Sequence, residues 1–317
     1  MSQDNRSACQ FRLGASALLL LIMGLPIFLG AQSSGYRPEN LDLMVREAKY
    51  EHGKVTELMV DGRYGFVIQP NGPLDSERRW VWDCPSWYAV LSAPPPRGSV
   101  AHRFYVESLL AKGFCVGGID VGISCGSPAA AKVCDDYYRV VIAKYRLNPR
   151  VRMIGQSNGG LIAYAWAFRH PQSVDRIMGI YPVTDMRTWP GLDKVASQVM
   201  TTAPDLNYNL TLQELTARLK EFNPIDNLRP LAEAGVVILH LHGNKDDLVP
   251  IGPNSEEAVE RYRVLGGEAD LIVFEGRSHG PTGGPQFHDE VFYNSDRALQ
   301  FLLDPCCRIQ TKASSTR

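Results

Sequence analysis

The feature that most limits the fold of this chain is a series of continuous apolar runs that alternate with stretches of helical spacing. The runs at residues 114–122, 151–155, 176–183 and 235–243 show no polar face, which is typical of strands buried on both sides in a parallel sheet. Parallel strands need a crossover, and right-handed crossovers give a doubly wound sheet covered by helices. Functional groups are then expected at the carboxyl ends of the strands.

A hairpin is expected before this alternation begins. Two short strands at residues 55–60 and 64–69 are separated by an Asp-Gly pair, a typical hairpin turn. Further strands are expected at residues 78–83 and 269–276. Helices are expected at residues 40–50, 102–111, 129–145, 160–169, 256–265 and 289–303.

Residues 184–229 interrupt the alternation. They contain Pro- and Thr-rich stretches and one helix-like run at residues 212–222. Because an apolar strand follows at residue 235, this segment is expected to be a cap inserted between core strands. The expected fold class is therefore α/β: one mostly parallel, doubly wound sheet with an inserted cap, occupying residues 32–317.

The first 31 residues have the pattern of a targeting segment. Arg6 and Arg12 precede an apolar run over residues 13–31, which ends in small residues, and Ala31 is a candidate position before a cleavage site. An uncleaved signal anchor is the alternative, and it would be the only expected contact with a membrane. The sequence thus predicts a secreted or periplasmic protein.

The charge of the chain and the spacing of its cysteines and histidines limit the partners, disulfides and metal sites that are expected. The 317-residue chain has a formal net charge of −1 and no basic tract, so nucleic acid is not an expected partner. Export would permit disulfides, and Cys125 and Cys134, which flank a short loop, are a candidate pair. Cys115, in an apolar strand, is expected to be a buried thiol. Neither CxxC nor HxxxH spacing occurs, so no metal site is expected.

Ser157 lies where a strand-like run becomes a helix-like run, within GQSNG at residues 155–159. This is a G-x-S-x-G pattern, whose tight turn needs small residues on both sides and presents the hydroxyl above the sheet edge. The amide of Asn158, at a helix N-terminus, would then point toward a developing oxyanion. An ordinary serine in a Gly-rich turn is the alternative interpretation.

A serine hydroxyl needs a base, and the base needs a carboxylate that orients it. HLHGNKDDLVP, at residues 240–250, follows a buried strand and offers Asp246 and Asp247. FEGRSHG follows the last strand and offers His279. The order Ser, Asp, His is the one expected of this architecture, with each residue just beyond the carboxyl end of a strand.

The other histidines have simpler interpretations. His240 is expected to be buried or at a strand edge, and His242 is expected to shape the acid loop. His288, which begins the final helix, is the competing base. His102 and His170 are expected at the surface.

With these motifs the chain resembles the α/β-hydrolase superfamily over nearly all of residues 32–317. The resemblance implies that the acid lies four residues before Pro250, which favours Asp246 over Asp247, and that His279 ends a GxxH-like stretch. VWD, GSPAA, GQSNGGLIAYAWAFRHP and YPVTDMRTWPG resemble a poorly characterised bacterial branch. Its members are described as α/β hydrolases or prolyl-oligopeptidase-like proteins and occur beside carbohydrate-active enzymes.

The second oxyanion donor departs from the pattern of well-known esterases. They place HGGG or HGxG after the third strand, where this chain has WDCP at residues 82–85. Because a proline has no amide hydrogen, the backbone amide of Asp83 or Cys84 is the expected donor.

Several aromatic residues and two aspartates are candidates for substrate contact. Asp120, which ends a strand, is a weaker candidate. Aromatic side chains can stack on sugars or aryl groups, but each of these can equally fill the core or the cap. The predicted substrate-binding residues are Trp82, Trp87, Asp185 and Trp189, with Tyr88 and Tyr181 nearby.

Taken together, the sequence predicts a secreted serine hydrolase that cleaves carboxylic esters, including acyl esters on carbohydrates, without a metal or organic cofactor. A prolyl-oligopeptidase-like serine peptidase is the alternative, disfavoured because no stretch of propeller length precedes the domain. A thioesterase is less natural outside the cytoplasm. A non-catalytic, ligand-binding protein of the same fold remains a further alternative.

Overall fold

The computed structural model describes residues 50–84, 102–199, 201–279, 292 and 295–304. The expected helix at residues 40–50, the targeting segment, Trp87, Tyr88 and His288 therefore lie outside the described residues, apart from Tyr50 at the end of that helix. Among the described helices, none is both long enough and apolar enough to cross a membrane.

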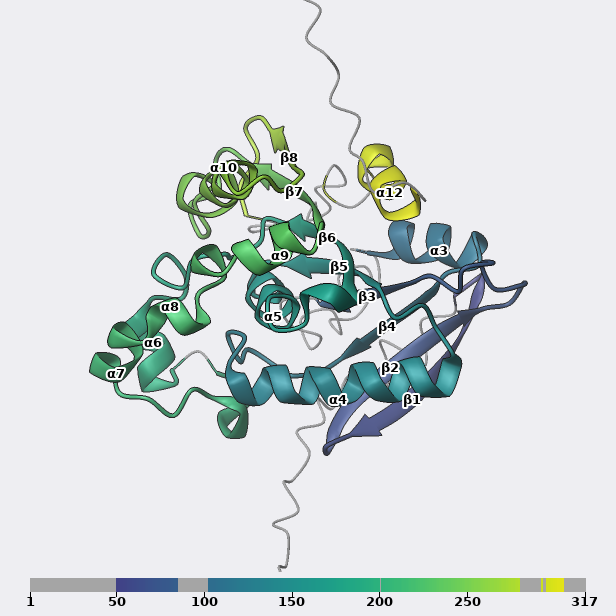
Figure 1. The fold of residues 1–317 in the computed structure, drawn as a ribbon, viewed down its shortest axis with the longest axis horizontal. Coiled ribbons are helices and arrows are strands. Elements are labelled where there is room, and N and C mark those ends of the chain that lie inside the picture. Colours follow the sequence, from purple (N-terminus) through teal and green to yellow (C-terminus); the bar gives the residue numbers. More distant parts are fainter. Residues whose placement is uncertain (1–49, 85–101, 200, 280–291, 293–294, 305–317) are drawn as a thin grey trace, which may run out of the picture. The chain divides into compact units, whose positions relative to one another are not determined.

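One mixed sheet organises the described residues (Figure 1). Its strand order is β1-β2-β4-β3-β5-β6-β7-β8, and every pair from β4 to β8 is parallel, whereas β1, β2 and β4 pair antiparallel. The strands are β1 (Gly53–Val60), β2 (Arg63–Pro70), β3 (Trp80–Cys84), β4 (Cys115–Ile119), β5 (Val151–Gln156), β6 (Val174–Ile180), β7 (Val237–Gly243) and β8 (Ala269–Phe274). This is the predicted α/β-hydrolase fold, and the predicted hairpin is its β1–β2 pair.

Helices cover both faces of the sheet. On one face, α4 and α5 pack together over a cluster that includes Trp82, Trp166 and Val151. On the other, α3 and α12 lie side by side over a cluster that includes Val81 and Ile154. The covering helices are α3 (Arg103–Ala111), α4 (Pro128–Tyr145), α5 (Asn158–Ala167), α10 (Glu257–Val264) and α12 (Asp296–Leu303). The short helical turn η1 (Pro171–Ser173) lies between α5 and β6, and the π-helical segment η4 (Gly252–Glu256) directly precedes α10.

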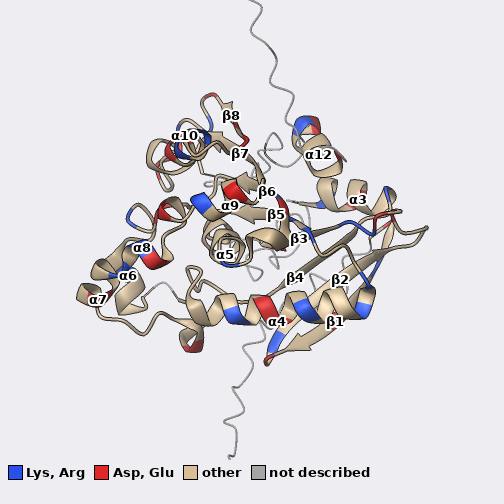
Figure 2. Cartoon of the chain, in the orientation of Figure 1, with Lys and Arg blue, Asp and Glu red and all other residues tan. Residues whose placement is uncertain are grey.

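Local signals set the ends of the longest helix. Ser127 accepts a hydrogen bond from the amide of Ala130, Pro128 occupies the first turn, and Arg146 ends α4 in a left-handed conformation. On its solvent side Lys132 pairs with Asp136, and Arg139 pairs with Asp135, so acidic and basic residues are interspersed along α4 (Figure 2).

The cap lies between β6 and β7, as expected. Its elements α6, α7 and α8 pack with Leu161, Val183 and Val249 in a third apolar cluster of their own. The cap thus has a core and is fixed to helix α5 through Leu161. Its elements and the helix that follows are α6 (Leu192–Ser197), η2 (Pro204–Leu206), α7 (Leu212–Ala217), α8 (Leu219–Phe222), η3 (Pro224–Asp226) and α9 (Arg229–Glu233).

The structure corrects two expectations about buried groups. Cys125 and Cys134 are both buried free thiols, so the expected pairing between them is wrong, whereas Cys115 is the buried thiol that the sequence predicts. His102 was expected at the surface, but it is 5% exposed and pairs with the carboxylate of Asp83. Its place at the start of α3, next to the end of β3, explains the difference.

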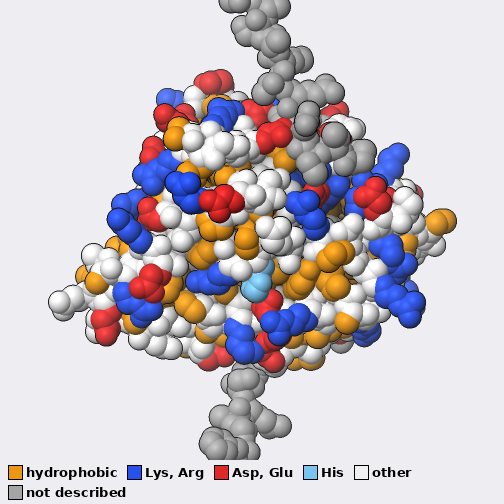
Figure 3. All heavy atoms as spheres, viewed as in Figure 1, with side chains coloured by type: hydrophobic (Ala, Val, Ile, Leu, Met, Phe, Trp, Pro, Cys, Tyr) orange, Lys and Arg blue, Asp and Glu red, His pale blue; other side chains and the backbone are white. Residues whose placement is uncertain are grey.

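The face of the described residues shown in Figure 3 has no single-sign charged patch that would indicate a ligand. On the face shown in Figure 3, side chains of both charges are scattered among apolar and uncharged ones. The functional site is therefore expected where the sequence places it, at the carboxyl edge of the sheet.

Candidate active site

Ser157 occupies a sharp turn between β5 and α5. Its backbone angles are φ 50° and ψ −122°, a conformation that side-chain-bearing residues rarely adopt and that typically costs about 1–3 kcal/mol. Hydrogen bonds hold the turn: the amide of Ser157 donates to Ile180, and its carbonyl accepts from Val183 and Gly160. The surrounding strands thus impose the conformation that presents the hydroxyl.

Glycines in the motif and directly after it make this turn possible. A Cβ on Gly155 would lie 3.2 Å from the carbonyl oxygen of Gly159, and a Cβ on Gly160 would lie 2.7 Å from Pro182. The first distance is tighter than most contacts of a Cβ atom, and the second is shorter than such contacts allow. The small residues are therefore needed because helix α5 approaches β5 and the residues after β6 so closely.

The three residues predicted for the triad form a chain of two contacts at hydrogen-bond distance, with His279 in the middle. The hydroxyl of Ser157 lies 2.9 Å from Nε2 of His279, and Nδ1 of His279 lies 2.6 Å from Oδ2 of Asp246. Because an ionised carboxylate can only accept, Nδ1 carries the proton and Nε2 is left as the acceptor for the hydroxyl. That tautomer is the one a general base needs.

Asp246 is held as a carboxylate. Its Oδ1 accepts from the amides of Leu248 and Val249, and its Oδ2 accepts from His242 and His279. Burial by itself raises the pKa of Asp246, but the hydrogen bonds from the two imidazoles and the amide of Val249, together with the electrostatic attraction of His279, bring the pKa down to about 2. The group is therefore ionised at neutral pH.

His242 shapes the acid loop, as predicted. Its Nε2 donates to Asp246 and to the carbonyl of Val249, and its Nδ1 accepts from the hydroxyl of Ser255 at 2.7 Å. The neighbouring carboxylate, Asp247, is exposed. The loop therefore turns Asp246, rather than Asp247, toward His279. Ser255 was not anticipated, since nothing in the local sequence marks it.

The predicted oxyanion donors lie beside the nucleophile turn. Asn158 is the first residue of α5, and Cys84 lies opposite Gly155 in the β3–β5 pair, with Asp83 opposite Ile154. The carboxylate of Asp83 is engaged by Nδ1 of His102 at 2.8 Å. Residues 85–101, which follow β3, are outside the described part of the chain, so the choice between the amides of Asp83 and Cys84 stays a prediction.

The structure corrects the expectation that Trp82 contacts substrate. It is 1% exposed, and its ring lies 5.0 Å from that of Trp166 and 5.2 Å from that of Tyr137. Because the side chains of a strand alternate between faces, Trp82 points into the core beneath α4 and α5. Asp120 is also buried, with one carboxylate oxygen accepting from the amide of Gly122.

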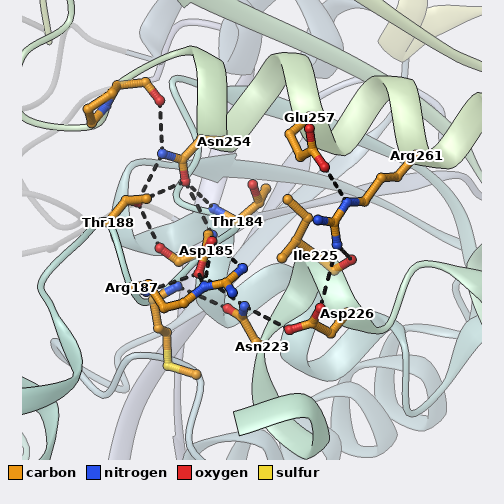
Figure 4. Close-up of polar contacts among 12 residues, drawn as sticks. Thr184, Asp185, Arg187, Thr188, Asn223, Ile225, Asp226, Asn254, Glu257 and Arg261 are labelled. Atoms are coloured by element: carbon orange, nitrogen blue, oxygen red, sulfur yellow. Dashed lines mark hydrogen bonds and ion pairs between the residues drawn. The ribbon is translucent and has the colours of Figure 1, made fainter. Parts of the chain in front are cut away.

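Asp185 belongs to a buried network that joins the cap to the core (Figure 4). Its carboxylate pairs with Arg187 at 2.7 Å and accepts from Asn223 at 3.1 Å, while its amide donates to Asn254. These contacts correct the expectation that Asp185 is a substrate ligand. Trp189 is half-buried against the apolar cluster of the cap, and its contact with substrate stays a prediction.

Within the described part of the chain, no group of three or more His, Cys, Asp or Glu side chains is arranged to hold a metal ion. The chemistry that the observed geometry can perform is proton transfer from Ser157 to His279, with the positive charge on the imidazole balanced by Asp246.

Residues 138–304, more than half of the chain and including Ser157, Asp246 and His279, match the prolyl oligopeptidase family. No curated protein matches the sequence.

Among solved structures, the chain is similar to a puromycin hydrolase S511A mutant (TM-score 0.57, 17% identity, 80% of this chain and 38% of that one). It is also similar to an acylaminoacyl peptidase of Pyrococcus horikoshii (0.59, 12%, 83% and 43%). A third is carboxyl esterase 2 of the mycorrhizal fungus Tuber melanosporum (0.54, 15%, 80% and 84%). The chain thus spans about two fifths of the first two proteins, and these identities show a shared fold.

Proposed function

Because the chain belongs to the prolyl oligopeptidase family, a family of serine hydrolases with this fold, we propose that it cleaves acyl bonds through Ser157, His279 and Asp246. The observation that carries the proposal is the pair of contacts at 2.9 Å and 2.6 Å that joins these three side chains above the carboxyl edge of the sheet.

The proposed reaction follows from the positions of the protons. Nε2 of His279 takes the proton of Ser157 as the hydroxyl oxygen attacks the acyl carbon, and Asp246 stabilises the imidazolium that forms. The amide of Asn158 and one from Asp83 or Cys84 hold the oxyanion. His279 then gives its proton to the leaving group. Water attacks the acyl-enzyme by the same route and restores the hydroxyl of Ser157.

We propose a peptide or acyl-amide bond as the first candidate substrate, because the family match extends over the whole region that carries the triad. The similarity to a puromycin hydrolase and to an acylaminoacyl peptidase is in keeping with it.

Carboxylic esters, including acyl esters on carbohydrates, are the second candidate. A specific observation favours it: the similarity to the Tuber melanosporum esterase extends over 84% of that protein. Export through residues 1–31, and a membrane contact limited to an uncleaved anchor, remain our predictions for the targeting segment.

The catalytic proposal is tested with a fluorophosphonate probe, which reacts with activated serines. Wild-type protein is expected to be labelled at Ser157, and Ser157→Ala is expected to give no label. Absence of label on the wild type, or equal label on the variant, would favour the non-catalytic alternative.

The two substrate classes are separated with a matched pair of compounds that carry the same acyl group as an ethyl ester and as a p-nitroanilide. A peptidase is expected to turn over both, because it can protonate an amine leaving group. An esterase is expected to turn over only the ester. A panel of acetylated and feruloylated sugars then tests the carbohydrate proposal directly.

A further inference from the structure

Besides its contacts with Ser157 and Asp246, His279 has an aromatic contact with a residue outside the triad. The ring of Tyr181, the first residue after β6, lies 4.5 Å from the imidazole of His279 between ring centroids, with an angle of 57° between the planes. A cation within about 6 Å of an aromatic centroid is attracted by the ring. The neutral imidazole gains little from this attraction, whereas the imidazolium that forms during the reaction gains more.

Tyr181 has a backbone conformation that is rare for a residue with a bulky side chain. Its φ is +34°, in the left-handed region that a bulky residue rarely enters, and its amide donates to the carbonyl of Leu241 at 2.7 Å. Such conformations persist only where the surrounding structure imposes them, and they gather at functional sites. Here the backbone bends directly after β6, and the ring is turned toward the carboxyl edge.

The ring is also fixed on its other sides. The amide group of Gln156 donates to the hydroxyl of Tyr181, and Phe292 packs edge-on against the ring at 5.1 Å. Gln156 directly precedes Ser157, so the turn that presents the nucleophile also anchors the ring against the base. Tyr181 is 1% exposed, which leaves it no surface for contact with substrate.

We propose that Tyr181 is a positioning residue for His279. Its ring holds the imidazole between Asp246 and Ser157 and stabilises the imidazolium formed when the serine gives up its proton. The inference rests on the proposed hydrolase function, but it assigns Tyr181 a role that neither the triad nor the oxyanion donors provide.

The test compares Tyr181→Leu, which removes the ring, with Tyr181→Phe, which removes only the hydroxyl. Tyr262→Leu is the matched control, because Tyr262 is also fully buried and its hydroxyl bonds to a backbone carbonyl, that of Val236. The rate of fluorophosphonate labelling of the full chain is measured for each variant, together with the amount of label at the end of the reaction.

The expected result is a labelling rate about tenfold lower in Tyr181→Leu, with the same final amount of label, and rates within about twofold of wild type in Tyr181→Phe and in the control. A lower final amount with an unchanged rate would mean that Tyr181 only supports the fold, and would overturn the proposal. Equal slowing by Tyr181→Phe would assign the effect to the hydroxyl, and would also overturn it.

A second measurement does not depend on catalysis. In protein labelled with ¹³C-histidine, the ring signals of His279 are assigned by their loss in His279→Gln. Because an aromatic ring shifts nearby signals, they are expected to move in Tyr181→Leu and to stay close to wild type in Tyr181→Phe. Unmoved signals in Tyr181→Leu would overturn the contact. If the His279 signals move in Tyr181→Leu but the wild-type protein takes no fluorophosphonate label, the contact stands and the proposed function is overturned instead.

Discussion

At the scale of single residues, the site depends on which of two neighbouring carboxylates is turned inward. Asp246 and Asp247 have the same chemistry, and the sequence offers both. Two backbone amides and two imidazoles hold Asp246, whereas Asp247 is exposed. These hydrogen-bond donors explain why Asp246 rather than Asp247 is turned inward, because a buried carboxylate is stable only where its oxygens accept hydrogen bonds.

This difference predicts opposite results from the same substitution at adjacent positions. Asp246→Asn is expected to lower kcat by about 10⁴-fold, because the amide no longer fixes the tautomer of His279 or balances its charge. Asp247→Asn is expected to leave kcat within about twofold of wild type. Steady-state kinetics with a p-nitrophenyl ester measure both, and a comparable loss in the two variants would contradict the assignment of the acid.

At the scale of elements, a buried hydrogen-bonded pair of side chains, Asp83 and His102, ties β3 to α3. Asp83 is the penultimate residue of β3, His102 precedes α3, and Nδ1 of His102 lies 3.0 Å and 2.8 Å from the two oxygens of the carboxylate. Sequence periodicity could not reveal this pair, because each partner has a polar side chain at the edge of an element. The pair forms only because the fold brings the end of β3 next to the start of α3.

Loss of this pair is expected to destabilise the protein. His102→Ala leaves the carboxylate of Asp83 buried without this partner, and the expected cost is about 3 kcal/mol. The matched control is His52→Ala, since His52 also pairs with a carboxylate, Glu107, but its side chain is 44% exposed, and the expected cost is below about 1 kcal/mol. Urea unfolding of both variants measures the difference, and similar costs would argue against a structural role for the buried pair.

At the scale of the whole molecule, the described residues are held together by packing rather than by covalent links. Three apolar clusters fill the two faces of the sheet and the cap. The four described cysteines, Cys84, Cys115, Cys125 and Cys134, are free thiols within this packing, and burial raises the pKa of Cys115, Cys125 and Cys134 to about 12. A thiol with so high a pKa is unreactive as a nucleophile at neutral pH.

The expected outcome is that iodoacetamide does not modify these four cysteines in the native protein and modifies all four after unfolding without a reducing agent. Peptide mass spectrometry identifies the modified positions. Detection of a cross-linked peptide that joins Cys125 and Cys134 would restore the pairing that the structure contradicts.

The sequence by itself determined the features that depend on neighbours along the chain. Continuous apolar runs with helical stretches between them specify a parallel α/β sheet, and the glycines around Ser157 specify the turn after β5, because period and backbone freedom are local properties. Most strand boundaries differ from the prediction by only a few residues, whereas α5 begins at Asn158 rather than at residue 160, since the helix starts within the motif itself.

The tertiary structure alone decided which of the candidate polar and aromatic side chains are buried and what they face. The order in which the strands pair, with β3 between β4 and β5, puts Trp82 in the core, buries His102 against Asp83 and brings Tyr181 to His279. Burial and contact depend on which elements become neighbours in space, and residues far apart in the chain carry no local signal of that pairing.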